Sequence, residues 1–264
     1  MTGRALTRVL GVLIAAGLSI GLAAMVQAAP HPARPAKPKP ACQNQTFEGS
    51  RFTVCPYRPA SQTFRLTWAD GGGRPLRSLK ALAASLGSDA PNLAFAMNAG
   101  MYEADGRPLG LYVEAGETKR RLRAGDGTGN FYLKPNGMLT VDADGALAIL
   151  TTQAYLAGDL HPVWATQSGP MLLIDGALHP AIDPDGPSRL IRNGAGVVDP
   201  STAYFVISDD PVSFGRLARL FRDRLGCRDA LFLDGTVSSL WAPSLNRRDP
   251  HEDLGPMLMV LDRH

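Results

Sequence analysis

The sequence predicts an α+β fold: a mixed, largely antiparallel sheet flanked by a few helices, in a single domain. Short apolar runs with the length of strands greatly outnumber segments with helical periodicity. The turn sequences at residues 135–137 and 142–145 frame a hairpin, which makes part of the sheet antiparallel. Residues 203–233 form one strand–helix–strand unit, and this combination is typical of an α+β fold.

The predicted strands are separated by turns that are rich in Gly and Asp. In chain order they cover residues 51–55, 63–68, 93–97, 109–114, 131–134, 138–141, 146–150, 171–174, 203–207, 230–233 and 257–261.

Two segments have the apolar spacing of helices. Leucines recur at intervals of three and four in residues 76–86, and apolar residues do so in residues 214–225. Ser213 is a candidate N-cap of the second helix and Gly226 a candidate stop signal. The arginines of this helix alternate around it and are expected to face solvent.

The amino-terminal region is predicted to direct export. Residues 1–29 read as a signal peptide, with basic residues, an uncharged stretch and small residues before the cleavage site. Residues 30–41 form a Pro-rich basic linker. The alternative is an uncleaved membrane anchor, the one membrane contact we expect. In both cases residues 42–264 lie outside the cytoplasm, in the periplasm or secreted.

Charge excludes one class of partner. The chain has 27 Lys+Arg and 24 Asp+Glu, a formal net charge of +3. The basic residues of positions 1–41 account for more than this excess, so the rest of the chain is slightly acidic. A nucleic-acid binder needs basic residues on its folded surface, and we therefore expect no nucleic-acid partner. The sequence does not give the oligomeric state.

The chain has three cysteines, of which two can pair in an oxidising compartment. Cys42 and Cys55 flank two short predicted strands about a Gly-containing turn, so they are the candidate disulfide. Cys227 then remains, and we expect it to be a buried small hydrophobic residue.

Candidate chemistry lies in four glycine-rich turns that follow or border apolar runs, at residues 98–102, 167–171, 192–196 and 233–239. The sequence has no nucleophile elbow, phosphate-binding loop or zinc-binding pattern, and we predict no metal ligands. The amides and hydroxyls of these turns can bind sugar hydroxyls. The third turn places Arg192 beside flexible glycines, and we expect it to bind a phosphate. The predicted substrate-binding residues are Asn98, Gly100, Gln167, Ser168, Gly169, Arg192, Asn193, Gly194, Gly235, Ser238 and Ser239.

Two carboxylates are the candidate catalytic groups, for acid/base or nucleophilic catalysis. Asp234 follows an apolar strand and is the first choice, and Asp209, at the end of another strand, is the second.

Taken together and in order, the four turns resemble the signature turns of the phosphodiester glycosidase family. The matching motifs are Asn98-Ala99-Gly100-Met101, Ser168-Gly169-Pro170, Arg192-Asn193-Gly194-Ala195-Gly196 and Leu233-Asp234-Gly235-Thr236-Val237-Ser238. The resemblance implies that residues 42–264 form a phosphodiester glycosidase-like domain. It implies an exported glycosidase that hydrolyses a sugar-1-phosphodiester, for example an N-acetylhexosamine linked through phosphate. The chain departs from the family at Asn193, where Thr is frequent, and at Thr236, where a second Gly is frequent.

Two alternatives stay open at this point. The first is a non-catalytic envelope domain that uses the same turns to bind a glycan or an anionic cell-wall polymer. An enzyme should instead bring Asp234, Arg192 and a second acid into one pocket. The second alternative is a calcium site, with no other cofactor expected, built from Asp183, Asp185, Asp209 and Asp210.

Overall fold

The protein is described by a computed structural model, in which residues 41–263 are placed. The predicted signal peptide (1–29) and all but the last residue of the predicted linker (30–41) lie outside the described residues. Across residues 41–263, no helix is long and apolar enough to cross a membrane.

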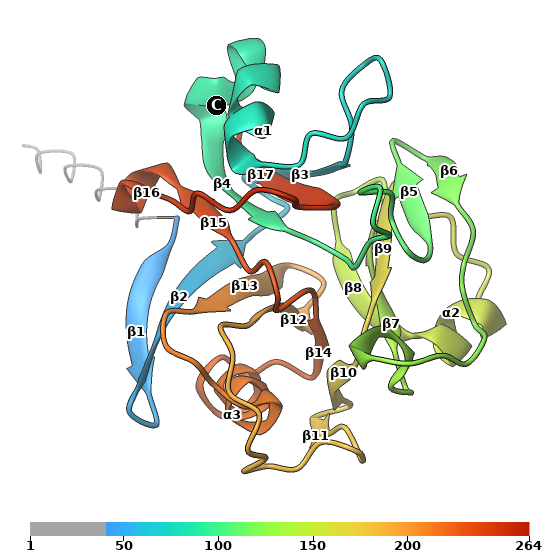
Figure 1. Cartoon of the computed structure of the whole chain (residues 1–264), viewed down its shortest axis with the longest axis vertical. Helices are drawn as coiled ribbons and strands as arrows, with labels where there is room; N and C mark the ends of the chain where they lie inside the picture. The colour runs from blue at the N-terminus through green and yellow to red at the C-terminus, as the bar shows by residue number, and fades with distance from the viewer. Residues whose placement is uncertain (1–40, 264) are drawn as a thin grey trace, which may run out of the picture. The chain divides into compact units, whose positions relative to one another are not determined.

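Three antiparallel sheets carry the fold (Figure 1). All strand pairings between the described elements are antiparallel. The seven-stranded sheet has the order β1 (Gln43–Phe47), β2 (Ser50–Tyr57), β13 (Thr202–Ser208), β12 (Asn193–Asp199), β14 (Asp229–Phe232), β10 (Met171–Ile174) and β11 (Ala177–Leu178).

The other two sheets have five strands each. One has the order β16 (Arg247–Arg248), β15 (Leu240–Ala242), β4 (Leu93–Asn98), β17 (Met257–Asp262) and β3 (Gln62–Thr67). The other has the order β6 (Glu117–Arg120), β5 (Tyr112–Glu114), β9 (Trp164–Ser168), β7 (Gly137–Val141) and β8 (Leu147–Thr151).

Helices are few and short among the described residues. They are α1 (Leu79–Ser85), α2 (Thr152–Ala157) and α3 (Phe214–Arg219), which continues as a π-helical turn, Leu220–Arg224. Short 3₁₀ turns lie at Gly87–Asn92, Asn130–Tyr132 and Pro243–Leu245. The predicted N-cap of α3 is confirmed, because Ser213 Oγ accepts a hydrogen bond of 3.1 Å from the Arg216 N–H.

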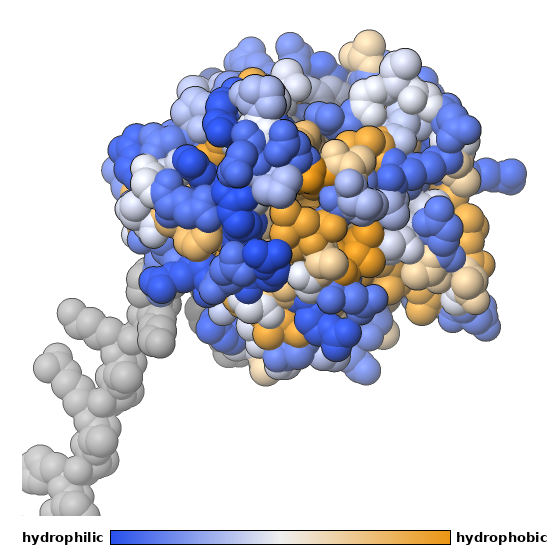
Figure 2. All heavy atoms as spheres, turned by 90° about the horizontal axis from the view of Figure 1, so that it is seen from below, coloured by the Kyte–Doolittle hydropathy of each residue, from blue (hydrophilic) through white to orange (hydrophobic). Residues whose placement is uncertain are grey.

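The predicted fold class is confirmed. The strand–helix–strand unit is β13, α3 and β14, and β12 lies between its two strands, so they run parallel without pairing with each other. The apolar residues of α3 pack on one face of the seven-stranded sheet, and the main core lies between the sheets. Seen from below, one area of apolar residues is bordered by hydrophilic ones (Figure 2).

Two local predictions were wrong. Residues 131–134 were expected to be a strand, but Asn130–Tyr132 form a 3₁₀ turn that buries Phe131 and follows Gly129, which has a positive φ of 87°. The flexible turn expected at residues 192–196 is instead the start of β12, in the middle of a sheet. Its glycines serve packing, because a Cβ on Gly196 would lie 2.5 Å from the Phe221 ring and 2.8 Å from Cys227 Sγ.

The cysteine predictions are confirmed. Cys42 and Cys55 form a disulfide across the β1–β2 hairpin, and Cys227 is free and buried. Because disulfides persist in oxidising compartments, this bond supports a location outside the cytoplasm.

Candidate active site

Two buried asparagines connect three of the four predicted turns. Asn98 ends β4 and Asn193 begins β12, and both are almost fully buried. Asn193 Nδ2 donates to Asn98 Oδ1 at 2.8 Å and to Asn98 O at 3.0 Å. A buried amide that donates to both the side chain and the backbone of its neighbour fixes the two strand ends in one arrangement.

The same amides hold the loop of residues 234–239 near its two ends. Asn193 Oδ1 accepts from the Asp234 N–H at 3.0 Å, and Asn98 Oδ1 accepts from the Ser239 N–H at 2.8 Å. Asn98 Nδ2 and Ser238 Oγ both donate to Asp234 O, at 3.1 and 2.9 Å. The predicted site residues Asn98, Asn193, Ser238 and Ser239 therefore come together, and these contacts position the Asp234 backbone.

Gln167 and Ser168, at the end of β9, also bond to the protein's own backbone. Gln167 Oε1 accepts from the N–H groups of Leu111 and Arg123 at 3.0 Å each, and its Nε2 donates to Arg123 O at 2.8 Å. Ser168 Oγ donates to Leu233 O at 2.5 Å, directly before Asp234. Both side chains therefore shape the site, and their polar atoms are occupied by these bonds.

The predicted glycines lie at close contacts within the protein. A Cβ on Gly100 would lie 2.4 Å from Thr166 Oγ1. The corresponding contacts are 2.7 Å to Asn136 Cβ for Gly169, 2.8 Å to Leu231 O for Gly194 and 2.8 Å to the Phe232 ring for Gly235. The absence of a side chain lets the strand ends approach one another at these points.

A cavity of about 460 Å³ lies beside these strand ends, within the size range of small-molecule sites. Asp234, Gly235 and Thr236 form one part of its wall, with Arg192 and Phe232. The loop after β4 and the 3₁₀ turn form other parts, through residues that include Tyr102, Glu103, Asn130 and Tyr132. Asp234 and Arg192 therefore line the same cavity, as the sequence predicts.

Asp234 has an altered proton affinity. Burial raises the pKa of its carboxyl from 3.8 to about 6, because the charged form is poorly solvated. The Thr236 N–H donates to Asp234 Oδ1 at 3.1 Å and opposes this rise in pKa. The carboxylate is thus ionised at neutral pH and becomes protonated in mild acid.

Arg192 is a buried guanidinium, only 1% exposed, that stacks on the Phe214 ring with a separation of 3.7 Å. Its Nε donates to Val212 O at 2.9 Å and its Nη2 to Ser188 Oγ at 3.0 Å, while Nη1 is buried without a partner. Burial, and then the charge of Arg189, lowers the pKa of Arg192 to about 10, so it remains cationic at neutral pH. None of the carboxylates in residues 41–263 forms an ion pair with it.

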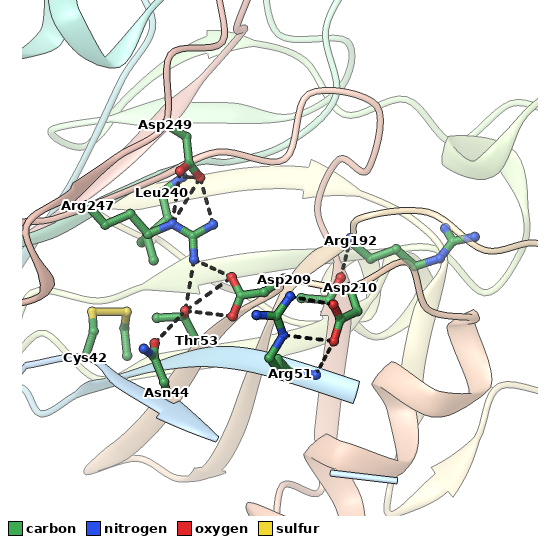
Figure 3. Close-up of polar contacts among 12 residues, drawn as sticks. Cys42, Asn44, Arg51, Thr53, Arg192, Asp209, Asp210, Leu240, Arg247 and Asp249 are labelled. Atoms are coloured by element: carbon green, nitrogen blue, oxygen red, sulfur yellow. Dashed lines mark hydrogen bonds and ion pairs between the residues drawn. A yellow bond between two sulfur atoms is a disulfide. The ribbon is translucent and has the colours of Figure 1, made fainter. Parts of the chain in front are cut away.

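Asp209 lies in a different cavity, of about 470 Å³, which shares no lining residue with the first. It pairs with Arg247, which also binds Asp249 at 2.9 Å (Figure 3). Asp210 pairs with Arg51 at 2.9 Å, and the Arg192 side chain extends away from this pair in Figure 3. The structure therefore does not bring Asp209 to Asp234, and within residues 41–263 no three acidic, His or Cys side chains form a cation site.

A family model described as phosphodiester glycosidase matches residues 91–260, more than half of the chain. The chain belongs to the phosphodiester glycosidase family.

The chain is also similar to one curated protein in sequence and to one solved structure in fold. The uncharacterized protein YigE of Escherichia coli K12 is 32% identical over 201 residues, which are 76% of this chain and 77% of that protein. A solved structure of the zebrafish N-acetylglucosamine-1-phosphodiester alpha-N-acetylglucosaminidase catalytic domain, auto-inhibited by its pro-peptide, has a TM-score of 0.56. It is 14% identical, and the match covers 84% of this chain and 82% of that one, which shows a common fold.

The cavity is also lined by residues that were not among the site residues predicted from the sequence. Tyr102 and Glu103 follow directly on the first family motif, and Tyr132 belongs to the 3₁₀ turn that was expected to be a strand. Burial raises the pKa of Tyr102, and the nearby charge of Asp234 adds to this rise. Tyr102 ends the predicted turn of residues 98–102 but was not among the predicted site residues.

Proposed function

We propose that this protein is an exported glycosidase that hydrolyses the glycosidic bond of a sugar-1-phosphodiester. The observation that carries the proposal is a single cavity in which the Asp234 carboxylate lies together with Arg192, a buried cation that has no acidic partner in residues 41–263. A buried cation of this kind is stabilised by an anionic ligand.

The leaving group determines how many catalytic groups the reaction needs. When the bond between C1 and oxygen breaks, the phosphodiester leaves as a phosphate monoester, whose second pKa is about 6. Such a group departs as a dianion without being protonated, unlike the alcohol released from an ordinary glycoside. One ionised carboxylate and one cation are then sufficient, and this is the set that the cavity offers.

Each residue has a defined role in this reaction. Arg192 attracts the phosphate and stabilises the charge that grows on it as the C1–O bond breaks. Asp234 either attacks C1 or accepts a proton from the attacking water, and it stabilises the positive charge that develops at C1. Water supplies the new C1 hydroxyl, and its other proton passes to the carboxylate or to solvent.

Glu103, the second acid of the cavity, is a weak candidate for proton donor. Its Oε1 accepts from Arg123 at 3.1 Å and lies 3.2 Å from Arg120 Nη2. Both guanidinium groups therefore contact the same carboxylate oxygen, which is engaged within the protein. Glu103 lines the same cavity as Asp234 and Arg192, and we assign it a structural role in the cavity wall.

The proposal is tested with a panel of sugar-1-phosphodiesters and the matching aryl glycosides, scored by the release of reducing sugar. We expect wild-type protein to release sugar from at least one phosphodiester, and Asp234→Asn to abolish the release. Binding of a phosphodiester without any release of sugar would favour the non-catalytic glycan-binding domain.

A further inference from the structure

A cluster of three arginines lies around Glu103, a residue that lines the cavity, although the arginines themselves do not line it. Arg107, Arg120 and Arg123, which we call the arginine rim, surround the Glu103 carboxylate. Arg120 and Arg123 lie 3.2 and 3.1 Å from its Oε1, and Arg107 lies 4.0 Å from its Oε2. Arg107 also pairs with Asp105 at 2.6 Å. The three arginines together with Glu103 and Asp105 therefore carry one more positive than negative charge.

The rim is directly connected to the cavity. Glu103 and Tyr132 both line it, and Arg123 bonds to both, since its Nη1 donates to the Tyr132 hydroxyl at 3.0 Å. The three arginine side chains are 30% to 49% exposed, so an entering molecule can reach them.

The backbone of Arg123, the central arginine of the rim, is held by a buried side chain. Gln167 is 1% exposed, and its amide bonds to both the N–H and the C=O of Arg123. A buried side chain whose acceptor and donor both hold one backbone position makes the placement of that residue specific. Gln167 adjoins the second family motif, so the rim is attached to the same strand end as the site.

The arginine of the second cavity is balanced differently. Arg247, in the second cavity, pairs with both Asp209 and Asp249. The rim combines a surplus of guanidinium groups with a position at the substrate cavity, in a domain that is slightly acidic as a whole. Under the proposed function, Arg192 binds the phosphate of the leaving group. The positive charge of the rim can therefore bind a second anionic group.

We propose that the arginine rim is a subsite for an anionic group on the alcohol side of the phosphodiester. This inference rests on the proposed function, and it narrows the substrate class to sugar-1-phosphodiesters whose alcohol component carries a further phosphate or carboxylate. An oligomeric phosphodiester is one such molecule.

The test compares three esters of the same sugar-1-phosphate: the ethyl ester, the 2-phosphoethyl ester and the 2-carboxyethyl ester. The sugar is the one released most rapidly in the panel described above. We expect KM for the charged esters to be about two- to fivefold lower than for the ethyl ester at low salt, as for partly exposed charge pairs. The preference should largely disappear in 0.5 M NaCl, because salt screens such pairs. A lower KM for the phosphoethyl ester alone would assign the subsite to phosphate.

A double variant and a matched control attribute the preference to the rim. Arg107→Gln/Arg120→Gln, which keeps Arg123 on Glu103, should bring the ratio of the KM values close to one. Arg228→Gln removes an arginine of similar type, 70% exposed and paired with Asp175, before β14 and away from the cavity, and should keep the wild-type ratio.

Equal KM values for wild-type protein on all three esters would overturn the subsite and leave the glycosidase proposal intact. No hydrolysis of any ester would overturn both. The wild-type ratio and its salt dependence need no variant, so they decide the question even if the double variant fails to fold.

Discussion

Replacing Asp234 by Asn should stabilise the protein while abolishing its activity. Burial raises the pKa of this carboxyl from 3.8 to about 6. Each pKa unit corresponds to about 1.4 kcal/mol, so ionised Asp234 destabilises the fold at neutral pH by at most about 3 kcal/mol. Because the side chain borders an open cavity, we expect about 1–2 kcal/mol. Asn keeps the shape and an oxygen acceptor for the Thr236 N–H.

The sign of the effect depends on pH. Folded protein binds the Asp234 proton more tightly than unfolded protein does, so the wild type gains stability as the pH falls from about 6 toward 3.8. The advantage of Asp234→Asn should therefore be complete at pH 7.5 and absent below about pH 4. For a domain of this size we expect the Tm at pH 7.5 to rise by about 3–6 °C.

Thermal unfolding followed by circular dichroism at pH 7.5 and pH 4, together with sugar release at pH 7.5, measures both effects. Asp210→Asn is the control, because a hydrogen bond from Arg51 lowers the pKa of Asp210 and the variant should gain no stability at neutral pH. A lower Tm of Asp234→Asn at pH 7.5, or retained sugar release, would refute the reasoning.

Four further predictions concern the same site and its support. The rate of sugar release should fall to half near pH 6 on the acid side, because Asp234 must be ionised, and a limb centred below pH 5 would contradict this role. Arg192→Gln should raise KM for phosphodiesters more than for aryl glycosides; equal increases in steady-state kinetics would exclude anion recognition. Asn193→Ala should lower the free energy of unfolding in urea by about 2–3 kcal/mol, since it leaves buried partners unsatisfied, and an unchanged midpoint would show that the amide pair is dispensable. Replacing Cys42 and Cys55 together by Ala should cost about 3 kcal/mol in the same assay, given their separation of 13 residues, and a loss below about 0.5 kcal/mol would count against the bond.

A strand was predictable from the sequence where its local composition is distinctive. The strands β4 and β14 are continuous apolar runs and were identified from the sequence, as was the cap of α3. Strand β12 was missed because Gly194 and Gly196 resemble turn residues, whereas they are required by Phe221 and Cys227 that pack on them. Tertiary packing of that kind leaves no signal in a single sequence.

The site was predictable to a similar extent. The shared cavity of Asp234 and Arg192 was expected for an enzyme of the family that the motifs resemble, and the structure brings it about through the pairing of β14 with β12, which was not predicted. The separation of Asp209 did not, because it depends on an ion pair with Arg247 from a different sheet. The roles of Asn98 and Gln167 as holders of backbone, rather than groups facing the cavity, likewise depend on contacts with residues remote in sequence.

Hydrolysis in water enriched in ¹⁸O tests the central claim most directly. A glycosidase breaks the bond between C1 and oxygen, so the label should appear in the C1 hydroxyl of the released sugar and the phosphate monoester should remain unlabelled. Mass spectrometry of the two products distinguishes this outcome from attack at phosphorus. Label in the phosphate monoester or in inorganic phosphate, with unlabelled sugar, would contradict the account.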